Sequence, residues 1–156
     1  MSAIEDRIES LGYTLPEGAT PLANYVPAVY VESAGLVFTS GHVPRNPDGS
    51  FVTGRLGADA TIEEGYRAAG LTALGILASL KATLGDLDRV KRIAKVLCFV
   101  NSTPEFTDQP SVANGLSDLL VEVFGDAGRH ARSAVGVAAL PANVCVEVEV
   151  VVEVSP

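Results

Sequence analysis

The sequence predicts a single α+β domain in which two long helices cover one face of a sheet. Three observations lead to this prediction. Two long segments place apolar side chains at helical spacing, and several shorter segments are apolar or alternate between apolar and polar residues. No repeat, linker or low-complexity tract divides the 156 residues. The whole chain, residues 1–156, is therefore expected to form one domain.

The first predicted element is a short helix at Ser2–Leu11 that ends at Gly12. Its apolar residues lie at helical spacing: Ile4, Ile8 and Leu11. Residues of about 1–15 are therefore expected to form a helical extension of the domain. Turn-forming residues predict a loop at 16–23.

Two strands are predicted next, at Tyr25–Glu32 and Leu36–Ser40. The small residues of Ser33–Gly35 form the expected turn between them. His42–Gly54 is rich in proline, asparagine, aspartate and glycine, which predicts a surface loop.

The central part of the chain predicts a helix, a strand and a second helix. The first helix covers Ala60–Leu84, with Thr61 as its N-cap and Gly85 at its end. A strand at Val90–Val100 and a helix at Pro110–Phe124 follow. Glycines at a spacing of five residues in the first helix predict a close approach of the sheet: Gly65, Gly70 and Gly75.

The last two predicted strands, Arg132–Ala139 and Val144–Val154, are expected to form a hairpin across residues 140–143. One face of the last strand is entirely apolar and is expected to pack under the helices. The opposite face carries Glu147, and the alternation predicts that Arg132 of the preceding strand shares this face. Arg132 and Glu147 are thus expected to lie on adjacent strands.

The same predicted face carries a run of small residues: Ala134, Gly136 and Ala138. A sheet face exposed to solvent is common in antiparallel sheets. A solvent-exposed face would tolerate long polar side chains. The small residues found here instead indicate that something packs closely against this face. A second copy of the chain is the economical candidate, because most soluble oligomers are homo-oligomers.

The composition disfavours several classes of partner. The formal net charge is −8, with only 11 lysine and arginine residues, so a nucleic acid or an anionic membrane surface is not expected as a partner. Cys98 and Cys145 lie in apolar runs without close ligand neighbours, which favours buried reduced thiols over a metal site or a disulfide. No signal peptide and no membrane-spanning run is present, so a cytoplasmic location is expected.

Four positions have side chains suited to chemistry. Arg132 is suited to bind a carboxylate through two parallel hydrogen bonds, although a surface salt bridge is the alternative. Glu147 is suited to hold a water and move its proton, although it also fits a plain acidic stripe with Glu149 and Glu153. Ser40, at the end of a predicted strand, can present its hydroxyl to a ligand. Tyr25 can form a side wall of the ligand site. The two histidines are interpreted as loop residues: His42 and His130.

These residues also lie in segments that resemble the Rid (YjgF-type) family. The segments are NYVPAVYVESAGLVFTSGHVP (24–44), VLCFVN (96–101), FTDQPSVANGL (106–116) and HARSAVGVAALPANVCVEVEV (130–150). The resemblance implies a chorismate-mutase-like sandwich with one mixed sheet, and a homotrimer with ligand clefts between subunits. It also implies cofactor-free hydrolysis of enamines and imines, such as 2-aminoacrylate, to 2-keto acids and ammonia.

The resemblance also assigns roles to individual residues. Arg132 matches the carboxylate-binding arginine, and Glu147 matches the acidic residue near the attacking water. Ser40, Tyr25 and Asn114 match residues of the substrate pocket. Ala134 stands where the family often has a cysteine. This position therefore has no thiol, and its main-chain carbonyl is left to hold the water. Two other readings remain open: a trimer that binds small carboxylic or keto acids without turnover, and a ribonuclease, which the acidic composition disfavours.

Overall fold

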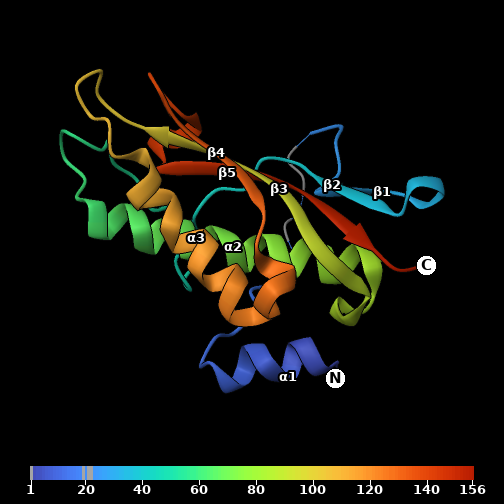
Figure 1. Cartoon of the computed structure of the whole chain (residues 1–156). Helices are drawn as coiled ribbons and strands as arrows, with labels where there is room; N and C mark the ends of the chain where they lie inside the picture. The colour runs from blue at the N-terminus through green and yellow to red at the C-terminus, as the bar shows by residue number, and fades with distance from the viewer. Residues whose placement is uncertain (1, 19, 21–22) are drawn as a thin grey trace.

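The computed structural model describes residues 2–18, 20 and 23–156, so part of the predicted loop at 16–23 lies outside the described residues. The helices and strands follow in the order α1 (Ala3–Ser10), β1 (Ala28–Val31), β2 (Leu36–Thr39), α2 (Ile62–Leu84), β3 (Val90–Asn101), α3 (Gln109–Phe124), β4 (Ala131–Val137) and β5 (Val146–Val154). Four short 3-10 turns lie between them: η1 (Glu32–Ala34), η2 (Leu87–Arg89), η3 (Gly125–Gly128) and η4 (Pro141–Asn143). One mixed five-stranded sheet carries α2 and α3 on one face, which confirms the predicted fold class (Figure 1).

Helix α2 has the ends that its sequence predicted. The hydroxyl of Thr61 accepts from the backbone N–H of Glu64 at 3.1 Å, and the Glu64 carboxylate accepts from the N–H of Thr61 at 2.8 Å. This reciprocal pair is a capping box. Gly85 ends the helix at φ 80°, in the left-handed region that glycine adopts without strain.

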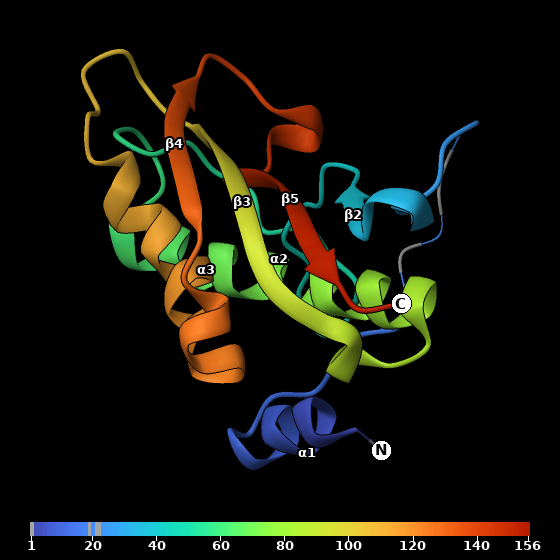
Figure 2. The same ribbon diagram turned by 45° about the vertical axis from the view of Figure 1, so that its right-hand side comes forward.

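The strand order is β1-β2-β5-β3-β4, and the predicted hairpin between the last two strands is wrong. Strand β4 pairs in parallel with β3 and lies at the edge of the sheet, whereas β5 lies between β2 and β3 and is antiparallel to both (Figure 2). Two causes account for this. Helix α3 returns the chain from β3 to a parallel neighbour, as crossover helices do. The strand with a fully apolar face gains most from the centre of the sheet, under the helices.

The register of β4 also corrects the predicted faces. Arg132 lies beside Val96 of β3, and Ala134 lies beside Cys98. Both β3 partners are fully buried under the helices, so Arg132 and Ala134 point toward the helix layer rather than sharing a face with Glu147. A Cβ on Gly136 would lie 2.6 Å from the hydroxyl oxygen of Ser102. At Gly136, therefore, the absence of a side chain makes room for Ser102 and Gln109 of the same chain.

The glycines of α2 mark a helix–helix contact more than a helix–sheet contact. A Cβ on Gly115 of α3 would collide with the backbone carbonyl of Tyr66 in α2. A Cβ on Gly70 would lie 3.6 Å from the carbonyl oxygen of Gly115, and Gly65 faces Val112 of α3. Of the three predicted glycines, Gly75 alone faces the sheet side, toward the ring of His42. The prediction named the wrong neighbour because glycine spacing reports close approach without identifying the partner.

The sheet face away from the helices, called here the open sheet face, is rich in apolar side chains. Val29, Phe38 and Val135 on it are 51%, 45% and 42% exposed. The strand registers place further apolar residues beside them: Leu97, Phe99 and Val151. An apolar surface of this kind is typical of a protein–protein contact.

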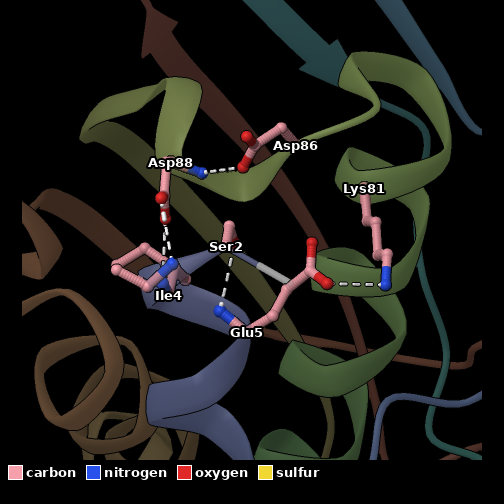
Figure 3. A network of polar contacts seen from close by, with 7 residues as sticks. Ser2, Ile4, Glu5, Lys81, Asp86 and Asp88 are labelled. Atoms are coloured by element: carbon pink, nitrogen blue, oxygen red, sulfur yellow. Dashed lines mark hydrogen bonds and ion pairs between the residues drawn. The ribbon is translucent and has the colours of Figure 1, made fainter.

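Helix α1 is docked on the rest of the domain (Figure 3). The carboxylate of Asp88 accepts from the backbone N–H groups of Ala3 at 2.9 Å and Ile4 at 2.8 Å. Glu5, which is nearly buried, pairs with Lys81 of α2 at 2.8 Å. Ile8 is 1% exposed and belongs to the main core. The N-terminal extension is therefore packed and capped by the domain. Among the described residues, no helix combines the length and apolar composition needed to cross a bilayer.

Candidate functional site

Arg132 lies at the start of the edge strand β4, against α3. Its Nη1 donates to the side-chain oxygen of Asn114 and to the hydroxyl of Ser117, each at 3.0 Å. Among the described residues, no carboxylate forms an ion pair with its guanidinium. The surface salt bridge that the sequence left open is therefore not formed. This guanidinium is held at one nitrogen, and its other N–H groups have no hydrogen-bond partner among the described residues, so it is suited to receive a ligand carboxylate.

Asn114, which the resemblance assigned to the substrate pocket, lies beside Arg132, and its observed contact is with the arginine itself. Ser117 makes the second contact, and sequence reasoning missed it. His130 lies in the loop between η3 and β4, as its sequence context predicts, and its Nε2 lies 2.9 Å from the hydroxyl oxygen of Ser117. The spacing of three residues between Asn114 and Ser117 places both on one helix face, which could have indicated a shared partner.

Glu147 lies on β5, beside Phe99 of β3, and its side chain is on the open sheet face. The Glu147 carboxylate packs directly against Gly41, and a Cβ added to Gly41 would collide with this carboxylate. Partial burial, and then the charge of Glu149, raise the pKa of Glu147 above its ordinary value. A carboxyl group with a raised pKa is better matched to accepting and returning a proton near neutral pH.

Ser40 and Tyr25 lie beside the turn that carries Gly41. The hydroxyl of Ser40 donates to the carbonyl of Val26 at 2.6 Å, and its N–H donates to the carbonyl of Pro27 at 2.8 Å. Tyr25 precedes β1 rather than belonging to it, and its side chain is 53% exposed. The two bonds of Ser40 therefore hold this end of β2 against the segment that contains Tyr25.

His42 lies outside the named strands, as predicted, but it is buried beneath the same turn, which the sequence did not predict. Its Nδ1 lies 2.8 Å from the carbonyl oxygen of Ser40, and its Nε2 lies 2.8 Å from the hydroxyl oxygen of Ser79 in α2. Burial lowers the pKa of His42 below its ordinary value, partly offset by the bond to Ser40. His42 is thus a neutral core residue that ties the turn to the helix layer.

The structure separates the predicted site residues into two groups. The arginine group consists of Arg132 with Asn114, on the helix side of the sheet at its β4 edge. The carboxylate group consists of Glu147 with Ser40 and the nearby segment of Tyr25, on the opposite side. Strand β3 lies between β4 and β5. A single copy of the chain therefore does not bring the guanidinium and the carboxylate together.

Other features of the described residues add no third group. Ala134 is half-buried and packs against the core, so its side chain is turned away from the open sheet face. Among the described residues, no cluster of three or more His, Cys, Asp or Glu side chains could hold a metal ion. One hollow of the described chain lies on the open sheet face, between Phe38 and Leu97, and another lies beside Leu15; neither is lined by Arg132 or Glu147.

Comparisons with known proteins identify the family and the fold of this chain. The family described as "YjgF/chorismate_mutase-like, putative endoribonuclease" matches residues 5–154. Protein TCP17 of Trypanosoma cruzi is 50% identical over 149 residues, which are 95% of this chain and 92% of the relative. The crystal structure of a "putative endoribonuclease" from Shewanella oneidensis superposes with a TM-score of 0.91 at 37% identity, over 97% of this chain and 99% of that one. E. coli TdcF with bound serine superposes with a TM-score of 0.61 at 25% identity, over 90% and 94%.

The mixed sheet with its helices on one face defines a small α+β domain of the chorismate-mutase-like class. Within that class, the chain belongs to the YjgF/Rid family.

Proposed function

We propose that this protein hydrolyses small reactive enamines and imines of the 2-aminoacrylate type to 2-keto acids and ammonia. The reaction takes place without a cofactor, in clefts between the subunits of a homotrimer in the cytoplasm. The observation that carries the proposal is the state of Arg132. Its guanidinium is oriented by two hydrogen bonds on one side, and no carboxylate of the described chain neutralises it.

The division of the site supports a cleft between copies. Because Arg132 and Glu147 face opposite sides of the sheet, the arginine of one copy must meet the carboxylate of another. The open sheet face, with its exposed Phe38 and Val135, offers an apolar surface for the neighbouring copy. A closed ring of three heterologous contacts satisfies every such surface.

In the proposed reaction, an enamine such as 2-aminoacrylate first becomes its imine as a proton moves from the nitrogen to the terminal carbon. Arg132 pairs with the carboxylate of this imine and fixes the imine carbon in the cleft. A water oxygen forms a bond to that carbon while the electron pair of the C=N bond moves to nitrogen. Glu147 accepts a proton from the water and delivers it to the nitrogen. Glu147 then carries the remaining hydroxyl proton to the nitrogen as the C–N bond breaks, so that ammonia leaves and the hydroxyl oxygen becomes the carbonyl of the 2-keto acid.

The residues fit these steps. The raised pKa of Glu147 favours a group that both takes and returns a proton. The main-chain carbonyl of Ala134 is proposed to help hold the water, and Ser40 and Tyr25 to shape the wall of the cleft. An enamine or imine substrate is already reactive, so orientation and one acid–base group are enough.

A second function from a different class is a trimer that binds small carboxylic or keto acids without turnover. The observation that favours it is the E. coli relative, which was solved with serine bound. In such a binder Arg132 keeps its role, but Glu147 has none in chemistry. A ribonuclease, which the printed names of some relatives suggest, is disfavoured by the net charge of −8 because RNA binding requires neutralisation of phosphates.

The test measures ammonia release from 2-aminoacrylate generated in situ. Arg132→Ala is expected to lose roughly 100-fold or more in kcat/KM, because a charge-assisted bidentate pair is removed. Arg129→Ala is the matched control, because Arg129 is exposed and, among the described residues, forms an ion pair only with Asp126. Equal rates for wild type and Arg132→Ala would refute the proposal.

Glu147→Gln separates the two candidate functions. Under the enzymatic proposal it lowers kcat by roughly 100- to 10,000-fold while the affinity for 2-ketobutyrate, measured by calorimetry, changes little. If wild type binds 2-ketobutyrate through Arg132 but releases no ammonia, the protein is a binder.

A further inference from the structure

The side chains behind Arg132 form a continuous chain of hydrogen bonds. Arg132 Nη1 donates to the hydroxyl oxygen of Ser117 at 3.0 Å, and that oxygen lies 2.9 Å from Nε2 of His130. The other ring nitrogen of His130, Nδ1, lies 2.7 Å from the carbonyl oxygen of Gly128. Three side chains and one main-chain carbonyl are thus linked between α3, η3 and β4.

Hydrogen-bond chemistry fixes the direction of each link when the His130 ring is neutral. The carbonyl of Gly128 can only accept, so Nδ1 of His130 carries a hydrogen. In the neutral ring Nε2 then accepts, and the hydroxyl of Ser117 donates to it. A lone pair of the same hydroxyl oxygen is left to accept from Arg132. Burial, and the nearby charge of Arg132, lower the pKa of His130, which favours this neutral ring.

The far end of the chain is anchored in the backbone. Gly128 is buried, and a Cβ at this position would collide with the carbonyl of Leu120 in α3. The Gly128 carbonyl, which accepts the hydrogen bond from His130, is therefore packed directly against α3, the helix that carries Ser117.

Resting on the function proposed above, we propose that Ser117 and His130 are positioning residues that hold the Arg132 guanidinium ready for a ligand carboxylate. Ser117, which His130 orients, and Asn114 both accept hydrogen bonds from Nη1 and hold this nitrogen against α3. Nε and Nη2 of Arg132 have no partner among the described residues and remain for the ligand. Because the arginine is held in place before binding, less rotamer freedom is lost when the ligand arrives.

A first experiment tests positioning without any ligand or activity. In the full-length protein, NMR of the Arg132 guanidinium is expected to show slow rotation about Cζ–Nη1 in wild type. Ser117→Ala should release this rotation, and Ser117→Thr, which keeps a hydroxyl, should restore it. Nitrogen shifts of His130 should report the neutral ring with hydrogen on Nδ1. Free rotation of Nη1 in wild type would overturn the proposal, whatever the protein catalyses.

A second experiment asks whether Ser117 and His130 act through Arg132. Ser117→Ala is expected to weaken 2-ketobutyrate binding, and to raise KM for the imine, by roughly tenfold, with little change in kcat. His130→Leu should behave in the same way, whereas His130→Gln, whose side-chain oxygen can accept from Ser117, should retain most of the affinity.

The decisive comparison is a double-mutant cycle with Arg132→Ala. If Ser117 acts only through the arginine, Ser117→Ala has no further effect on affinity in the Arg132→Ala background. An equal loss in both backgrounds would show a purely structural role and refute the inference. Absence of ammonia release in wild type would refute the proposed reaction but leave the NMR and binding results to decide the positioning role.

Discussion

Arg132 lies beside Val96 in the parallel register of β3 and β4, and Val96 is fully buried beneath the helices. This relationship turns the arginine to the side of the sheet opposite Glu147. A working site built from both residues therefore needs two copies of the chain.

This division predicts complementation between two inactive variants. Arg132→Ala and Glu147→Gln should each be inactive alone, but mixed trimers formed by co-expression should recover activity. With random mixing, about a quarter of the clefts combine an intact arginine with an intact carboxylate. Ammonia release by the purified mixture measures the recovery. No recovery in a mixture shown to contain hybrid trimers, or a monomeric protein at assay concentration, would contradict the divided site.

Gly41 is predicted to be required for the placement of the carboxylate. A Cβ at position 41 would collide with the Glu147 side chain, so Gly41→Ala should displace it from the cleft. A misplacement of this kind is expected to reduce kcat roughly 10- to 100-fold while the fold is retained. Gly70→Ala is the matched control, because its new Cβ meets only an ordinary contact at 3.6 Å. Unchanged kcat in Gly41→Ala would place Glu147 outside the reaction.

His42 is predicted to make stability depend on pH. Its pKa is lowered in the folded protein, so the unfolded chain binds the proton more tightly. The stabilising contribution is then complete above the unfolded pKa, near 6.5, and is lost as the pH falls through the folded pKa. Urea unfolding at pH 7.5 and pH 5.5, at one protein concentration, should show a smaller fall in His42→Gln than in wild type. Equal falls would mean that His42 is not buried as a neutral ring.

Helix α1 is predicted to be an integral part of the cooperative fold. Ile8 is 1% exposed in the main core, so Ile8→Ala should lower the free energy of unfolding by about 2–5 kcal/mol. Glu9→Ala, an exposed change in the same helix, is the control and should have little effect. Urea unfolding measures both. An unchanged midpoint for Ile8→Ala would show that α1 detaches before the domain unfolds.

Some of the structure followed from local sequence. The capping residues Thr61 and Gly85, and the apolar spacing of the helices, fixed α2 and α3 to within a residue or two. The alternating valines of β5 correctly predicted one buried face. These features depend on neighbours within a few positions of one another, which a sequence displays directly.

The arrangement of the last strands could not be predicted in the same way. Alternation assigns the residues of one strand to two faces, but it does not state which face of one strand matches which face of another. The assumed hairpin placed Arg132 with Glu147, whereas pairing with β3 separated them. The roles of Ser117 and His130 depended on the same pairing, because only the position of β4 against α3 brings them to the arginine.

The sequence by itself determined an α+β domain, its main helices, and the residue types available for chemistry, because propensity and periodicity act over short distances along the chain. The tertiary structure decided which strand lies in the centre of the sheet, which face each functional side chain occupies, and which residues hold the arginine. Those outcomes depend on the burial of apolar faces that lie far apart in the sequence, and the lowest free energy of that packing is a property of the whole domain.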